Sequence, residues 1–179
     1  MSQNQVASTL THAEEAWSAL SAVLKDGGSK ASPEAAMSCI TACTVALLGD
    51  KTAHLRPGGL KNGETQYSVA AAVMISPDRQ HNIFIAQQNF PEDQFRLGIA
   101  IDHGHPGRVV KNEKSLILAN TDEHEDFAQI LSTSRMGSSI YAPFFWGDVM
   151  LGQLICGAQA RNTYRPLDLE LLEAFSHVA

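Results

Sequence analysis

The most reactive side chains in this chain of 179 residues are three cysteines. Cys39 and Cys43 lie one turn apart in a segment with helical periodicity, and Cys156 lies between apolar neighbours in a strand-like run. A cysteine acts as a nucleophile only in its thiolate form, which apolar surroundings disfavour. We therefore expect all three to be small hydrophobic side chains with a structural role, and we predict no catalytic residue.

A second reactive group consists of His103, His105 and His124, close in sequence to the acidic run 122–126. Such a set could hold a metal ion, but zinc-binding helices carry ligand pairs at i and i+3 or i+4, and no second pair of this kind accompanies these histidines. His103 and His105 flank Gly104 in a turn that we expect to be exposed. We interpret the histidines as hydrated, the acidic run as the polar start of a helix, and predict no metal site.

Charge and composition exclude several classes of function. Lys and Arg total 13 against 19 Asp and Glu, a net charge of -6, so we expect no nucleic-acid partner. No apolar run reaches the roughly 18 residues of a membrane helix, and the N-terminus lacks a signal-peptide pattern. We expect a cytoplasmic protein with reduced thiols and no membrane partner, organised as one domain with a short appendage.

Two helices are predicted before the first strand. Thr11 and Glu14 have the spacing of a capping box, and the helix that follows ends near 27–28. Ser32 and Pro33 predict the start of a second helix that ends near Gly49. We assign residues 1–31 to the appendage, which either folds back or projects, and residues 32–179 to the domain. The apolar face of the first helix consists of Ala16, Trp17, Leu20, Val23 and Leu24.

The remaining segments predict an antiparallel sheet with helices at both ends of the sequence, an α+β fold. Short apolar and β-branched runs are separated by turn residues, and Gly147 with Asp148 predicts a type II′ hairpin turn. Residues 51–66 form a loop or an irregular strand near 53–55. The expected elements are strands at 67–75, 82–87, 96–102, 115–119, 138–146 and 149–160, a sharp turn at 103–107, a helix at 121–131, and a helix from Pro166 to the last residue.

The second half also carries a series of motifs in a fixed order. A turn containing Gly104 and Gly107 precedes an apolar strand at 116–120, and a serine with alternating apolar residues follows. The later motif residues are Ser138, Ile140, Ala142, Pro143 and Phe144, then Gly147 and Gly152, then Tyr164, Asp168, Leu171 and Leu172. In this order they resemble the GAF domain family of small-molecule sensing modules, over residues 32–179 and best after Leu97.

The resemblance implies a central antiparallel sheet of five or six strands, with the N- and C-terminal helices on one face and a ligand cavity on the other. Aromatic walls, hydroxyls and one basic side chain would suit a small anionic or zwitterionic ligand. Core packing would explain Phe127, Ile130 and Tyr141 equally well, and strand alternation lets at most one of Ser138 and Tyr141 line the cavity. The expected ligand-binding residues are Phe127, Ile130, Arg135, Ser138, Tyr141, Gly104 and Gly107.

We expect a non-catalytic sensor or regulatory domain. One enzymatic branch of the family, the free methionine-(R)-sulfoxide reductases, uses cysteines in the turn-rich middle of the domain, where residues 97–137 contain none. That redox activity and a ligand-free dimerisation module are the alternatives. We expect no cofactor, because no cysteine is placed to attach a bilin, although haem ligation by a histidine stays open. We also expect a homodimer through the terminal helices, with Trp17, Leu20 and Leu24 near the interface.

Overall fold

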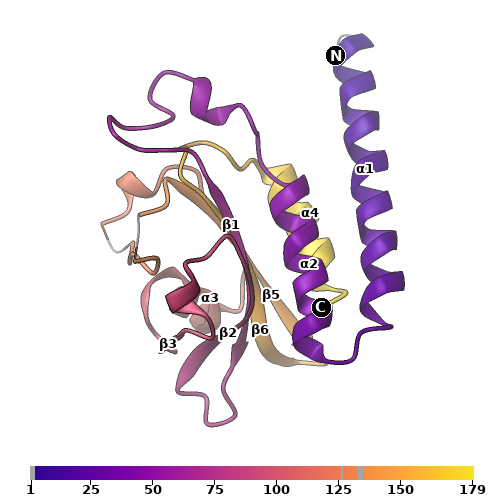
Figure 1. The fold of residues 1–179 in the computed structure, drawn as a ribbon, viewed down its shortest axis with the longest axis vertical. Helices are drawn as coiled ribbons and strands as arrows, with labels where there is room; N and C mark the ends of the chain where they lie inside the picture. The colour runs from indigo at the N-terminus through magenta and orange to yellow at the C-terminus, as the bar shows by residue number, and fades with distance from the viewer. Residues whose placement is uncertain (1–2, 126, 133–134) are drawn as a thin grey trace.

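The structure, a computed structural model, describes residues 3–125, 127–132 and 135–179, with the backbone alone for residues 3–13. Helices cover one face of a central sheet (Figure 1). The strands are β1 (Ser68–Ile75), β2 (His81–Gln88), β3 (Gly98–Ala100), β4 (Leu116–Leu118), β5 (Ser138–Trp146) and β6 (Val149–Ala158). The helices are α1 (Gln3–Gly27), α2 (Pro33–Leu47), α3 (Gly104–Asn112) and α4 (Pro166–Ser176), with 3-10 turns η1 (Ala53–Leu55), η2 (Glu92–Gln94) and η3 (Thr121–Glu123).

The sheet has six strands in the order β3-β2-β1-β6-β5-β4, and each neighbouring pair is antiparallel. This confirms the α+β fold class and the hairpin expected at Gly147 and Asp148. Gly147, at φ 57°, supplies the positive φ that the first central position of a type II′ turn requires. Gly152 allows β1 and β6 to approach closely, since a Cβ there would lie 2.1 Å from the carbonyl oxygen of Val73.

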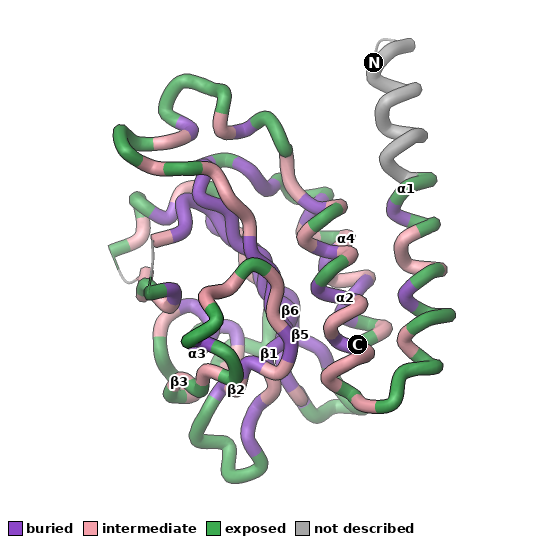
Figure 2. The backbone as a smooth tube through the Cα atoms, viewed as in Figure 1, coloured by how far each residue is buried: buried purple, intermediate pink, exposed green. Residues whose placement is uncertain are grey.

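Strand alternation divides the core into two layers. Ala70 of β1 and Leu154 of β6 face α2 and α4 and pack with Phe175 of α4. Ala71 and Ile155 face the other way, into a second cluster to which α3 contributes. Figure 2 shows the central strands largely buried, whereas the connecting turns are exposed.

Polar contacts cap α2 and connect its end to the start of α4. Ser32 caps α2 as predicted, because its hydroxyl accepts a hydrogen bond from the amide of Ala35 at 3.2 Å. The buried carboxylate of Asp168 accepts hydrogen bonds from the amides of Arg165 and Gly49, both at 2.8 Å. One carboxylate therefore closes the start of α4 and holds the end of α2. The prediction that the last helix runs to the final residue is wrong, because α4 ends at Ser176.

Helix α1 folds back along the outer side of α2. Ala16 and Val23 are buried, whereas Trp17 is 75% and Leu24 60% exposed. The predicted start at Thr11 is wrong, because the helix already begins at Gln3. No helix within the described residues is long and apolar enough to cross a membrane.

Of the two alternatives for residues 51–66, the structure has the loop, with the 3-10 turn η1 at 53–55 in place of an irregular strand. Two further predictions of local structure are wrong. The expected sharp turn at 103–107 opens α3, because Pro106 lies in the first helical turn, where its missing N–H costs nothing. The expected helix at 121–131 is only the turn η3, which Asn120 caps by accepting from the amide of Asp122 at 3.1 Å, and residues 127–132 have no regular structure.

Candidate functional site

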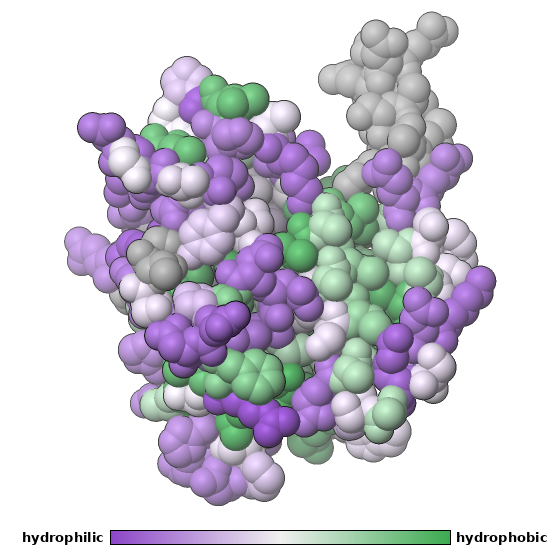
Figure 3. Space-filling view, viewed as in Figure 1, coloured by the Kyte–Doolittle hydropathy of each residue, from purple (hydrophilic) through white to green (hydrophobic). Residues whose placement is uncertain are grey.

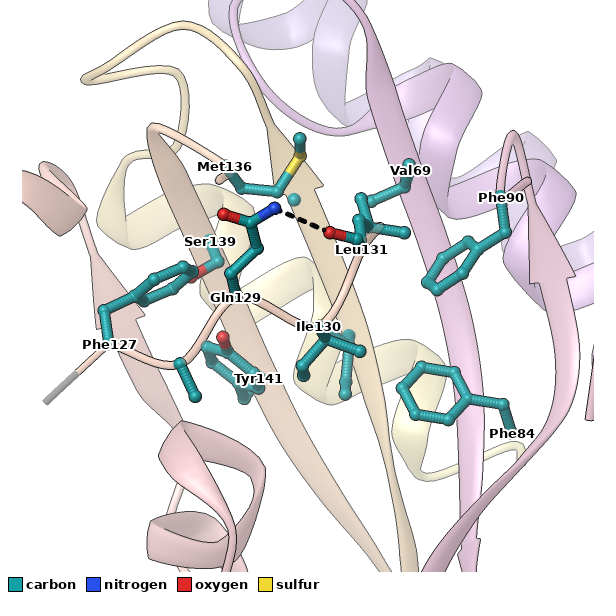
Figure 4. Close-up of a pocket in the computed structure, with 13 residues that line it drawn as sticks. Val69, Phe84, Phe90, Phe127, Gln129, Ile130, Leu131, Met136, Ser139 and Tyr141 are labelled. Atoms are coloured by element: carbon teal, nitrogen blue, oxygen red, sulfur yellow. Dashed lines mark hydrogen bonds between the residues drawn. The ribbon is translucent and has the colours of Figure 1, made fainter. Parts of the chain in front are cut away.

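A cavity of about 40 Å³ lies on the sheet face opposite α2 and α4. Residues 127–132, which we call the cover segment, lie across it. Figure 4 shows Phe84 and Phe90 on one side and Phe127 and Tyr141 on the other, with Ile130 between them. The full lining consists of Val69, Phe84, Phe90, Phe127, Ala128, Gln129, Ile130, Leu131, Met136, Ser139, Tyr141, Ile155 and Gly157.

The sheet provides the floor of this cavity. Ser139 and Tyr141 are alternate residues of β5, so both side chains point to the same face. Gly157 of β6 keeps the floor open, because a Cβ there would lie 3.1 Å from Cγ of Met136 and 3.2 Å from Cγ2 of Val69. The cavity is therefore shaped by strand register and by one missing side chain.

Gln94 of η2 holds the cover segment in place. Its Nε2 donates to the carbonyl oxygen of Ile130 at 2.8 Å, and its Oε1 accepts from the amide of Ser132 at 3.0 Å. The side chain is buried, and it satisfies backbone groups that have no partner in a strand or helix. A single amide thus fixes the distal half of the cover segment.

Arg135 holds the start of the cover segment. Its Nη2 donates to the carbonyl oxygens of Thr121 at 2.6 Å and His124 at 2.9 Å, and its Nη1 donates to that of Phe127 at 3.3 Å. The guanidinium carbon lies 4.8 Å from the centre of the Phe127 ring, a cation–π contact. The guanidinium thus serves the loop backbone and lies outside the cavity lining.

Two hydroxyl groups give the cavity floor its polar character. Ser139 is 2% and Tyr141 3% exposed. Burial raises the pKa of Tyr141 to about 12, and the nearby Ser139 hydroxyl opposes this increase. The Ser139 Oγ itself makes no hydrogen bond of ordinary geometry with any described residue. The floor therefore offers a phenol that stays protonated and a hydroxyl with unused hydrogen-bonding capacity.

His105 of α3 is buried beneath the cover segment, so the expectation of a hydrated side chain is wrong for this residue, whereas His103 is exposed. The imidazole ring centre lies 5.7 Å from that of His124, 5.3 Å from Phe127 and 6.4 Å from Tyr141. Among the described residues no three His, Cys, Asp or Glu side chains are grouped to hold a metal ion. The described contacts place His105 in an aromatic cluster behind the cavity wall.

Of the seven residues predicted for the site, the structure brings Phe127, Ile130 and Tyr141 together in the lining. Ser138 is on the opposite face of β5, where its Oγ donates to the carbonyl oxygen of Ala160 at 2.8 Å. Strand alternation therefore separates Ser138 from Tyr141 as expected. Arg135 contacts the cover segment from outside the lining.

Gly104 and Gly107 belong to α3 and also lie outside the lining. A Cβ on Gly107 would lie 2.2 Å from the carbonyl carbon of Asp102, so this glycine permits close packing at the start of α3. Ser139 and Gln94 were not predicted. Ser139 is two residues from Tyr141, so alternation would have identified it, but no sequence signal connects Gln94 with a segment 36 residues away.

The three cysteines are remote from this cavity. Cys156 is 1% exposed and faces α2 and α4, in the core layer on the other side of the sheet, and Cys39 and Cys43 are half-buried on α2. Burial raises the pKa of Cys156 to about 12, although Thr44 and Lys51 oppose the increase. Burial also raises the pKa of Cys43. None of the three thiols lines the cavity.

Arg161, just after β6, ties the loop before β1 to the turn η3. This nearly buried guanidinium pairs with Glu64 and, through Nε, with Asp122 at 2.9 Å, while Nζ of Lys61 lies 2.7 Å from Asp122. Hydrogen bonding from Arg161 lowers the pKa of Asp122. The ion pairs therefore fix the base of the loop that leads into the cover segment.

Comparisons with known proteins agree on the fold. The GAF domain model matches residues 60–179. The GAF domain of an Acinetobacter phosphoenolpyruvate-protein phosphotransferase is 13% identical, with a TM-score of 0.70, 99% of this chain and 90% of that chain covered. A putative GAF sensor protein from Burkholderia vietnamiensis is 14% identical, with a TM-score of 0.71 and coverage of 93% and 92%.

An enzyme has the same fold. The free methionine-R-sulfoxide reductase from Neisseria meningitidis, solved in complex with its substrate, is 13% identical, with a TM-score of 0.66 and coverage of 89% of this chain and 82% of that chain. At such identities the likeness concerns the fold alone. No curated protein sequence matches the chain.

Proposed function

This chain belongs to the GAF domain family, and from that membership we propose that it is a non-catalytic sensor or regulatory domain that binds a small molecule in the cavity under the cover segment. The observation that carries this proposal is the cavity itself, which is buried between the sheet and a segment without regular structure. Small-molecule sites are typically concave and mostly apolar with a few placed polar groups. The Ser139 and Tyr141 hydroxyls are such groups.

The cover segment supports a signalling role because, among the described residues, side-chain hydrogen bonds and apolar packing, rather than a strand ladder, hold it in place. Gln94 and Arg135 bind its backbone through side-chain hydrogen bonds, whereas the strands beneath are joined by continuous ladders. A ligand that favours one position of the segment would shift its population. Phe127 would carry that shift to Arg135, which also contacts Thr121.

Thermal unfolding against a library of metabolites tests the proposal. A ligand present at 100 times its dissociation constant adds about 2.7 kcal/mol to the free energy of unfolding, which raises Tm by about 5–10 °C for a chain of this size. The same compounds should not be consumed. If no compound stabilises the protein, the sensor proposal fails.

A matched pair of variants locates the binding site. Ile130→Trp places a bulky ring in the cavity lining and should abolish stabilisation by a hit from the library. Glu123→Trp adds the same ring at an exposed position of η3 and should leave the stabilisation intact. A hit that stabilises both variants equally binds elsewhere on the protein.

A redox enzyme of the methionine-sulfoxide type is the second candidate, because one structural neighbour is such an enzyme. The position of the cysteines argues against it, since Cys156 is buried on the helix side of the sheet and burial raises its pKa to about 12. A dithiol-dependent turnover of free methionine sulfoxide that disappears in Cys156→Ser would overturn the non-catalytic proposal. Cys43→Ser is the control, because it changes another cysteine on the helix side of the sheet and leaves Cys156 intact.

We further propose that two copies associate through α1, so that ligand binding reaches a helix pair. Ala16 and Val23 bury one edge of α1, whereas Trp17 and Leu24, seven residues apart on one helical face, remain exposed. Figure 3 shows hydrophobic residues gathered over α2 and the adjoining part of α1. Leu20 is partly buried against the core and would lie at the border of the interface.

Sedimentation tests this association. The wild-type chain should sediment as a dimer at micromolar concentration, and Trp17→Ser with Leu24→Ser should sediment as a monomer, because these exposed side chains make no contribution to the core. A monomeric wild type refutes the association. A dimer that binds no compound in the library would instead favour the ligand-free dimerisation module.

A further inference from the structure

The cavity lining carries a distinctive chemistry. Among the described residues that form it there is no charged side chain, and the polar side chains are Gln129, Ser139 and Tyr141. Gln129 is exposed and donates to the carbonyl oxygen of Leu131 at 2.9 Å, so its amide is already used within the cover segment. The groups that face a ligand from the floor are therefore two hydroxyls in an apolar surround.

Arg135 does not add a charged group to the cavity lining. The sequence suggests that this side chain would attract an anion, but it lies outside the cavity lining, its Nη atoms donate to three backbone carbonyls, and its guanidinium stacks on Phe127. An anion in the cavity would leave water without gaining this cation, which is unfavourable because a buried charge requires a partner. The main reason to expect an anionic ligand is therefore removed.

The Ser139 hydroxyl favours a ligand that carries a hydrogen-bonding group. It is buried, lines the cavity and has no hydrogen bond of ordinary geometry with a described residue, which is an unfavourable state for a polar group. Tyr141, two residues along the same strand face, carries its phenol next to it. Because burial raises the pKa of Tyr141 to about 12, this phenol stays uncharged at neutral pH and can both donate and accept.

The size of the cavity limits the ligand and connects it with the cover segment. The 40 Å³ present is well below the roughly 150 Å³ of an apolar cavity that accommodates benzene. A molecule with one ring therefore needs the cover segment to move outward. Gln94, which joins Ile130 and Ser132 to η2, is the contact that such a movement would strain.

We propose that the ligand is a small, uncharged and largely apolar molecule, of about the size of a phenol, with one hydroxyl that hydrogen-bonds to Ser139 and Tyr141. This inference rests on the proposed sensor function and specifies its ligand class. The apolar body of the molecule lies among Phe84, Phe127 and Ile130, and its entry displaces the cover segment.

Three probes of matched shape test the ligand class by calorimetric titration at neutral pH. They are 4-methylphenol, toluene and 4-methylbenzoate, which carry a hydroxyl, no polar group and a carboxylate on the same ring. We expect 4-methylphenol to bind about 2- to 10-fold more tightly than toluene, the range of one additional hydrogen bond, and 4-methylbenzoate not to bind.

Two adjacent serines provide the matched variants. Ser139→Ala should reduce the preference for 4-methylphenol over toluene to about 2-fold or less, because it removes one of the two cavity hydroxyls and leaves only that of Tyr141. Ser138→Ala should leave the preference unchanged, because that hydroxyl is on the opposite strand face and donates to Ala160. Both changes remove a single oxygen, so thermal unfolding of each variant shows whether it is folded under the conditions of the titration.

Several outcomes would overturn the inference. These are tighter binding of 4-methylbenzoate than of 4-methylphenol, equal binding of 4-methylphenol and toluene to the wild type, and an unchanged preference in Ser139→Ala. Failure of all three probes to bind, combined with stabilisation by a charged metabolite, would overturn this ligand class but leave the sensor function intact. Absence of stabilisation by any compound would refute the sensor function itself.

Discussion

Replacing Gln94 with methionine should loosen the cover segment while leaving the sheet unchanged. Methionine has nearly the same length but cannot make the hydrogen bonds to Ile130 and Ser132, which measure 2.8 and 3.0 Å. An intramolecular hydrogen bond contributes about 1 kcal/mol, so the closed segment should lose about 2 kcal/mol relative to an open state in which water satisfies both groups. This corresponds to an approximately 30-fold increase in the population of the open state.

Native-state hydrogen exchange measures this population directly. The amide of Ser132 should exchange about 30-fold faster in Gln94→Met, whereas the amide of Ile155, in the central strand β6, should be almost unaffected because it opens with the sheet. Gln129→Met is the control, since that exposed side chain bonds only within the cover segment. Unchanged exchange at Ser132, or an equal acceleration at Ile155, would refute the assignment of Gln94 as the contact that holds the segment.

Three other perturbations test other parts of the structure. Arg161→Met should lower the free energy of unfolding by about 2–3 kcal/mol at neutral pH. This is less than for a fully buried pair, because Asp122 still reaches water. Since Arg161 lowers the folded pKa values of Asp122 and Glu64 below their ordinary values of 3.8 and 4.5, the stability it provides is complete above about 4.5 and is lost as the pH falls through the folded values. Urea unfolding curves of wild type and variant should therefore converge on acidification, and a constant difference would contradict the pairing. Cys156 should resist iodoacetamide until the protein unfolds, because burial raises its pKa to about 12, and alkylation at the rate of a free thiol would show that the thiol is accessible. Gly107→Ala should lower stability by about 2 kcal/mol or more, because its Cβ would lie 2.2 Å from the backbone of Asp102, and an unchanged Tm would contradict the close packing of α3.

Elements determined by local chemistry could be predicted from the sequence. The β5–β6 hairpin follows from Gly147 at a turn between two apolar runs, and the start of α2 follows from Ser32 and Pro33. In both cases neighbouring residues provide the turn or the cap, and no distant contact is needed. The resemblance to the GAF family, which rests on the motif series from Gly104 to Leu172, gives the correct sheet and helix layer.

Elements determined by distant contacts were not predictable. Phe127 and Ile130 have helical spacing, yet they reach the core from a segment without regular structure whose backbone is satisfied by Gln94 and Arg135. His105 lies between a glycine and a proline, a pattern typical of exposed turns, but the start of α3 is packed under the cover segment and buries it. Long-range packing decided the structure in each case.

Because α1 is long, a small tilt at its packed end would produce a larger displacement at its far end. The helix contains 25 residues, about 37 Å at a rise of 1.5 Å per residue, and the side chains buried from its described part, Ala16 and Val23, lie in its C-terminal half. A tilt of about 5° around this contact region, acting over the roughly 20 Å of helix beyond Ala16, would move the far end by about 2 Å. Such a tilt requires only small shifts between α1 and α2, comparable to the adjustments of packed helices in allosteric proteins. A rearrangement of a fraction of an ångström in the core would thereby become a displacement large enough for another protein surface to detect.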